Sequence, residues 1–115
     1  MYLLVSILEQ THHLPAILEG FARIGVQGST VIESTGMGRV LMKFHAASAE
    51  TKQINKVLRD LESSNKTMLT VIKNKDQVDK AIEVIKSFCG DLSEPGKGIL
   101  FTIPLEFVEG LLETN

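Results

Sequence analysis

Two glycine-rich loops contain the residues of this chain that could bind an anion. The first reads Gly36-Met37-Gly38-Arg39 and the second reads Glu94-Pro95-Gly96-Lys97-Gly98. Glycines allow backbone N–H groups to converge on a negative charge, and the side chains of Arg39 and Lys97 would add charge-assisted hydrogen bonds. Either motif alone is more often an ordinary turn. A binding site therefore requires a fold that brings such loops together.

The other reactive side chains do not form a catalytic or metal-binding pattern. The sequence has no Ser-His-Asp or Cys-His arrangement, no P-loop and no zinc motif. His12 and His13 are adjacent and point in different directions, which favours a solvated helix start over a metal site. Cys89 ends an apolar helical stripe, so we predict a packed thiol. We expect neither an enzyme nor a metal centre.

The composition is that of one soluble globular domain covering residues 1–115. Hydrophobic residues make up 43% of the chain and charged residues 23%, and 115 residues leave no room for two independent cores. A net charge of −2 gives no reason to expect nucleic acid or an anionic membrane as a partner. The single cysteine cannot form an intrachain disulfide, which fits a cytoplasmic location.

Hydrophobic periodicity predicts the order strand–helix–strand twice. In the first helix, Leu14, Ile17 and Phe21 lie on one face, and Gly25 suits the stop. Two such units on one antiparallel sheet make an α+β, ferredoxin-like βαββαβ sandwich with both helices on the same face. The predicted strands lie near residues 2–8, 28–34, 66–72 and 98–103, and the predicted helices near 14–24 and 76–88.

The two halves are separated by an insertion at about residues 36–65. We predict that it begins with the first glycine loop and an extended stretch at 40–44, followed by a helix in which apolar residues repeat from Ile54 to Leu61. After the last strand, Pro104 is predicted to open a short helix over residues 105–112.

One face of the sheet is left without helices and needs cover. We assign four residues of mixed polarity to this face, and an apolar face exposed to water would be unfavourable. Either the inserted helix or another subunit must therefore cover it. The four residues are Thr70, Ile72, Leu100 and Thr102.

Residues 24–39 resemble the segment that leads into the T-loop of PII nitrogen-regulatory proteins. Thr30, Gly36, Gly38 and Arg39 match the PII pattern, and Gly96 and Lys97, followed by Gly98, match its second nucleotide loop. The resemblance implies a homotrimer in which these loops meet at a cleft between subunits. There they would bind the phosphates of an adenine nucleotide such as ATP, ADP or AMP.

The chain also departs from the nitrogen-sensing PII proteins. Val40 replaces the glutamine that helps hold magnesium and 2-oxoglutarate, and the insertion has no tyrosine for uridylylation. The C-terminal segment with nucleotide-binding arginines is missing, and residues 107–110 read Phe-Val-Glu-Gly instead. The resemblance therefore indicates a PII-like protein outside the nitrogen-sensing branch.

This reading predicts a non-enzymatic signal-transduction regulator in the cytoplasm. It would bind a small anionic effector, which the resemblance implies is an adenine nucleotide, and it would regulate an unidentified target protein. The protein itself would reach a membrane only indirectly, through a partner transporter. One alternative is a CutA-like trimeric binding module with a metal ion or no ligand. A more distant alternative is an enzyme with its site in the intersubunit cleft.

Overall fold

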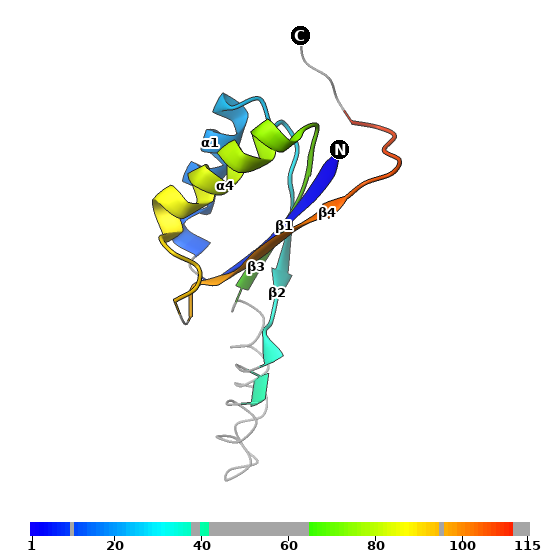
Figure 1. Ribbon diagram of the computed structural model, residues 1–115. Helices are drawn as coiled ribbons and strands as arrows, with labels where there is room; N and C mark the ends of the chain where they lie inside the picture. Colours follow the sequence, from blue (N-terminus) through cyan, green and yellow to red (C-terminus); the bar gives the residue numbers. More distant parts are fainter. Residues whose placement is uncertain (10, 38–39, 42–64, 95, 112–115) are drawn as a thin grey trace.

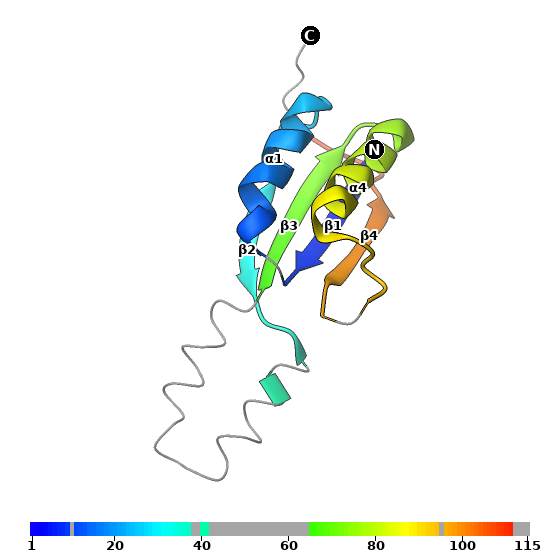
Figure 2. The same ribbon diagram turned by 90° about the vertical axis from the view of Figure 1, so that its left-hand side faces the viewer.

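A computed structural model describes residues 1–9, 11–37, 40–41, 65–94 and 96–111. In this part of the chain, a four-stranded antiparallel sheet has two helices packed on one face (Figures 1 and 2). The strand order β2-β3-β1-β4 confirms the predicted α+β, ferredoxin-like fold. The strands are β1 (Tyr2–Leu8), β2 (Thr30–Ser34), β3 (Asn65–Ile72) and β4 (Gly98–Pro104), and the helices are α1 (Leu14–Arg23), which follows a short 3-10 helix (Thr11–His13), and α4 (Lys75–Cys89).

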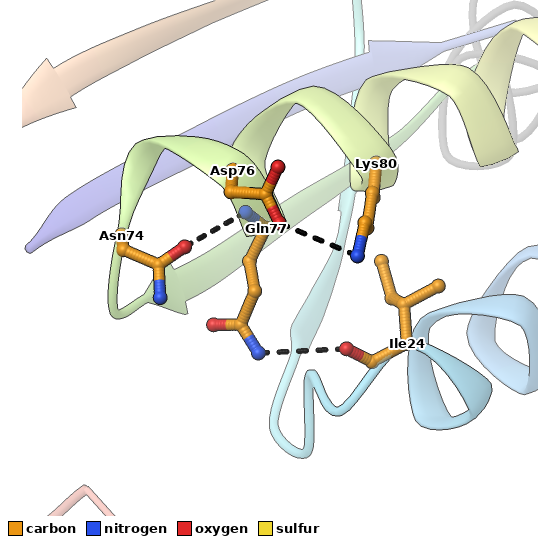
Figure 3. A network of polar contacts seen from close by, with 5 residues as sticks. All are labelled: Ile24, Asn74, Asp76, Gln77 and Lys80. Carbon is orange, nitrogen blue, oxygen red and sulfur yellow. Dashed lines mark hydrogen bonds and ion pairs between the residues drawn. The ribbon is translucent and has the colours of Figure 1, made fainter.

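The residues at the two ends of helix α4 explain where this helix begins and ends. The Asn74 side chain accepts a hydrogen bond of 2.9 Å from the backbone N–H of Gln77, which caps the first turn (Figure 3). Gly90 follows the last turn with φ +76°, a conformation that favours glycine. The Gln77 side chain also donates to the Ile24 carbonyl at 3.4 Å, and Asp76 pairs with Lys80 at 3.3 Å (Figure 3). The bond between Gln77 and Ile24 connects the start of α4 to the end of α1.

The core lies between the two helices and one face of the sheet. Strand register places alternate residues of β1 and β3 against buried side chains of α1 and α4. Ser29 and Thr70 hydrogen-bond through their hydroxyls at the border of this core. Its buried members are Leu4, Leu8, Met68 and Ile72 from the sheet, Ile17 and Phe21 from α1, Val78, Ala81, Ile85 and Cys89 from α4, and Val26.

The prediction of which residues face away from the helices was wrong. Thr70 and Ile72 are fully buried under the helices, and Leu100 packs against the same core. Thr102 is paired with Leu4 and so shares that face. Successive residues of a strand point to opposite faces, so an error of one residue reverses the assignment. The helix-free face instead has an apolar surface formed by Leu3, Val5, Ile7, Ile32, Leu69, Val71, Ile99, Phe101 and Ile103.

The predicted C-terminal helix is also wrong over residues 105–111, which have no helical structure. The backbone N–H of Leu105 donates to the Met1 carbonyl at 2.8 Å, so the chain continues to pair beside β1 after Pro104. Gly110 has φ +94°, which is incompatible with a right-handed helix. Pairing with a residue far away in sequence has therefore overridden the local helix signal.

The start of the insertion differs from the prediction too. Val40 and Leu41 have helical backbone and are not extended, and the Val40 N–H donates to the Gly36 carbonyl at 3.1 Å. Residues 42–44 and the helix predicted over Ile54–Leu61 lie outside the described residues. Of the helices that the structure describes, none has the length and apolar character needed to cross a lipid bilayer.

Candidate functional site

The first glycine loop follows β2 at one end of the sheet. Ser34, the last residue of β2, lies opposite Asn65, the first residue of β3, and its hydroxyl is 2.7 Å from that of Thr67. A Cβ atom on Gly36 would lie 3.4 Å from Nδ2 of Asn65, so loop and side chain are in contact. Thr30 begins β2 and is exposed on the helix-free side of the sheet. Gly38 and Arg39 lie outside the described residues.

The second glycine loop is shaped by its own hydrogen bonds. The Asp91 carboxylate accepts 2.9 and 2.8 Å bonds from the backbone N–H and hydroxyl of Ser93. These bonds favour the charged form and lower the pKa of Asp91. Gly96 adopts φ +78°, and the Lys97 carbonyl accepts a 3.4 Å bond from the N–H of Glu9. The loop is thereby connected to the end of β1.

A close contact between β1 and β4 requires a glycine at position 98. It adopts φ +131°, and a Cβ atom there would lie 2.2 Å from the Ile7 carbonyl oxygen of β1. No L-amino-acid side chain fits at that distance. The sequence interpretation, which considered Gly98 only as part of an anion loop, did not include this contact between strands.

Strand order determines how the two loops lie relative to each other. Leu8 of β1 pairs with both Lys66 and Gly98, so the start of β4 and the start of β3 lie at the same end of the sheet as the end of β2. However, β2 and β4 are the two outer strands, with β3 and β1 between them (Figure 2). Three strand spacings amount to roughly 14 Å. Within one chain, the two loops therefore share an end of the sheet but lie at opposite edges.

The charged residues near these loops have different surroundings. Lys66 forms an ion pair with Glu33 across β2 and β3. Lys97 lies close enough to Cys89 for its charge to favour the thiolate, but burial is the larger effect and raises the pKa of this thiol. Cys89 is 3% exposed, which confirms the predicted packed thiol.

We expect the Cys89 thiol to react slowly with an alkylating reagent in the folded protein. Its raised pKa keeps it protonated at pH 8, and burial blocks the approach of the reagent. Alkylation by iodoacetamide, followed by mass spectrometry, should be at least about tenfold slower in buffer than in urea that unfolds the chain. Equal rates in the two solutions would contradict the buried position.

The histidines of the described residues, His12 and His13, lie in the 3-10 helix that follows β1 and precedes α1. The rings of His12 and His13 have centroids 4.0 Å apart, and His13 lies 5.8 Å from the ring of Phe88. Within the described ranges, no group of three or more His, Cys, Asp or Glu side chains could hold a metal ion.

Asn65 is the residue near the first loop that sequence reasoning missed. It was considered only as part of the break before the third strand, yet it is 5% exposed and contacts Gly36. The available signal was a carboxamide at the first position of a strand, directly after the insertion. Sequence spacing could not show that this carboxamide lies beside the glycine loop.

A small cavity of about 160 Å³ lies at the other end of the sheet. It is lined by the turn after α1, the end of β3 and Leu111 of the C-terminal segment. Neither glycine loop reaches it, because β3 begins at the loop end and finishes at the cavity. The cavity therefore does not belong to the candidate anion site.

The fold and the glycine loops define a class of protein: a ferredoxin-like domain in which a long segment joins β2 to β3. The family model of nitrogen regulatory protein P-II matches residues 1–113, so the chain belongs to this family, whose members are regulatory proteins. Among solved structures, the chain is similar to Arabidopsis thaliana PII bound to citrate, with a TM-score of 0.57 and 20% identity. The alignment covers 90% of this chain and 76% of that chain, and at this identity it supports the fold. A comparison with curated protein sequences found no match.

Proposed function

We propose that this chain is a PII-like signal-transduction protein that binds an adenine nucleotide at clefts between the subunits of a homotrimer. The observation that carries this proposal is the position of the two loops, at one end of the sheet but at opposite edges. A second copy whose β4 edge meets this β2 edge would bring its Lys97 beside Gly36. One anion site would then use Gly36, Gly38 and Arg39 of one subunit and Gly96, Lys97 and Gly98 of the next. Thr30 begins β2 and lies roughly 13 Å along the strand from Ser34 at the loop end, so it would contact a part of the nucleotide other than the phosphates.

The helix-free face supports assembly of several copies. Three residues of β4 are well exposed on this face: Ile99 at 55%, Phe101 at 42% and Ile103 at 43%. A large contiguous apolar surface is uncommon on a soluble monomer and usually marks an interface. Three copies with their helix-free faces turned inward would cover this surface and would keep the helices outside.

The regulatory step would act through the segment between β2 and β3. This segment directly follows the first glycine loop, so an effector held at Gly36 contacts its beginning. An effector that binds one conformation of the segment better than another shifts the population towards it. A target protein in the cytoplasm, including a transporter at a membrane, would respond to that population.

Removing either loop cation should weaken nucleotide binding. Loss of one charge-assisted contact costs about 1.5–3 kcal/mol, or roughly ten- to a hundredfold in affinity. Calorimetry with ATP, ADP and AMP on the wild type, Arg39→Ala and Lys97→Ala measures this loss. Lys80→Ala is the control, because Lys80 is an exposed α4 residue paired with Asp76 and not part of either loop.

The same titrations test the alternatives. A wild type that binds no adenine nucleotide at millimolar concentration would refute the proposed effector and leave a trimeric module of the CutA kind. 2-Oxoglutarate with magnesium should not tighten ATP binding, because the Val40 side chain offers no ligand to the metal. A clear cooperative effect of 2-oxoglutarate would place the chain among the nitrogen sensors after all.

A further inference from the structure

The cavity at the end of the sheet opposite the glycine loops has the size of a small molecule. Its volume is about 160 Å³. A protein cavity of roughly 150 Å³ holds a molecule of the size of benzene. An adenine ring is larger than benzene, and a whole nucleotide is several times larger. The cavity is therefore too small for the proposed nucleotide and suits a ligand of roughly six non-hydrogen atoms.

The lining of this cavity combines a cation, two carboxamides and an apolar wall. Among the described residues of the lining, Lys73 is the charged one, and it directly follows the end of β3. Gln27 and Gln77 contribute the carboxamides. A matching ligand has one negative group and an apolar body. The residues of the apolar wall are Val26, Val71, Ile72 and Leu111.

The side chain of Gln77 is held at the cavity by a contact with the end of α1. Its Nε2 donates to the Ile24 carbonyl at 3.4 Å (Figure 3). A carboxamide has two N–H donors and an acceptor oxygen, so within the described residues one N–H group and Oε1 remain for a ligand. Gly25 has φ +90°, and a Cβ atom there would lie 3.1 Å from Nε2 of Gln77. A side chain at position 25 would therefore displace this carboxamide.

Lys73 is the group that would bind the negative end of the ligand. The start of α4 does not offer the N–H group of Gln77, because the Asn74 side chain already accepts it at 2.9 Å. A carboxylate on the Lys73 ammonium forms a charge-assisted hydrogen bond, which is stronger than a bond between neutral groups. Inorganic phosphate could also bind this ammonium, but it would leave the apolar wall without a partner. The lining therefore favours a carboxylate with a carbon chain.

We propose that this cavity is a binding site for a small aliphatic carboxylate, with Lys73 contacting the carboxylate and the apolar wall contacting the carbon chain. The site goes beyond the proposed nucleotide site, and none of its residues belongs to either glycine loop. Gln27 precedes β2 and Leu111 belongs to the C-terminal segment, so a bound ligand would connect parts of the chain that are far apart in sequence. The protein would then have two binding sites of different chemistry.

Butyrate and butyramide form the test pair, because they have nearly the same size and shape but differ in charge. In NMR titrations of the wild type, butyrate at millimolar concentration should shift the backbone amide resonances of Gly25, Gln27 and Gln77 until they saturate. Butyramide should bind about tenfold more weakly, the effect expected when one charge-assisted hydrogen bond is lost. Absence of saturable shifts with butyrate, or equal affinity for the two compounds, would overturn the proposal.

Two lysine variants test the role of Lys73. Lys73→Gln removes the charge and should bind butyrate and butyramide equally. Lys75→Gln is the matched control, because Lys75 is exposed, pairs with Asp79 at 3.7 Å and does not line the cavity. It should keep the preference for butyrate. Equal loss of the preference in both variants would show an effect of net charge and would overturn the assignment of Lys73.

A further titration separates this site from the proposed nucleotide site. The wild type in the presence of ATP should bind butyrate with an unchanged dissociation constant. Competition between ATP and butyrate would overturn the assignment of a second site. The titrations without nucleotide do not depend on the proposed function, so a chain that binds butyrate but no nucleotide would retain this site and refute the nucleotide effector.

Discussion

Phe101→Glu is expected to convert the proposed trimer into monomers. Phe101 lies on the helix-free face of β4, opposite Val5 and between the exposed side chains of Ile99 and Ile103. A carboxylate enclosed in that apolar interface would cost several kcal/mol in each subunit, because no described residue of this face is a cation that could pair with it. Light scattering at micromolar concentration should give the chain mass of 12.6 kDa for the variant and three times that mass for the wild type.

A matched control is available on the opposite side of the molecule. Phe88 of α4 is 39% exposed, close to the 42% of Phe101, but it lies on the helical side. Phe88→Glu should therefore keep the trimer mass. A wild type with the mass of one chain would refute the assembly, and a dimer would count against the PII-like arrangement. If Phe88→Glu and Phe101→Glu have the same mass, the helix-free face has no special role in assembly.

Gly98→Ala should destabilise the fold more than any other exchange in the two loops. The added Cβ would meet the Ile7 carbonyl oxygen at 2.2 Å, and φ +131° is unfavourable for alanine. Backbone strain of this kind costs about 1–3 kcal/mol, and forced separation of packed groups adds a similar amount. Thermal denaturation followed by circular dichroism should show a midpoint lowered by roughly 10–20 °C, or no folded protein.

Gly28→Ala provides the comparison for this exchange. No atom lies within 4 Å of a Cβ built on Gly28, and its φ is not positive. Alanine there should leave stability unchanged or raise it by about 0.4–1 kcal/mol, since it restricts the unfolded chain. Similar midpoints for the two variants would mean that β1 and β4 do not approach each other as closely as described.

Local signals were sufficient to predict the four strands and the two helices of the sandwich. Helix α4 was predicted at residues 76–88 from its apolar stripe and Gly90, and it spans Lys75–Cys89. The Asn74 cap, which the prediction did not use, is also a local signal in the sequence. Strand β2 begins at Thr30, two residues later than predicted, since residues 28 and 29 belong to the irregular connection between α1 and β2. Periodicity and turn residues determine such boundaries without any knowledge of distant contacts.

Features that depend on distant contacts could not be predicted in the same way. The face of Thr70 and Ile72 depends on the register between β1 and β3, and the course of the chain after Pro104 depends on the hydrogen bond from Leu105 to the Met1 carbonyl. The buried position of Asn65 beside Gly36 depends on the pairing of β2 with β3. Sequence motifs therefore indicated which loops to consider. The strand order was needed to show that the two loops of one chain lie at opposite edges of the sheet and cannot form one site together.

Among the strands that the structure describes, the two edges of the sheet are different strands, β2 and β4, and this limits how copies can associate. Contact of a β2 edge with a β4 edge is head-to-tail, so every added copy presents a fresh edge of each kind. Such a contact ends only if the rotation between neighbours closes a ring, and any other rotation produces an open polymer. For this chain, the angle between adjacent subunits would decide between a soluble ring and a growing fibre.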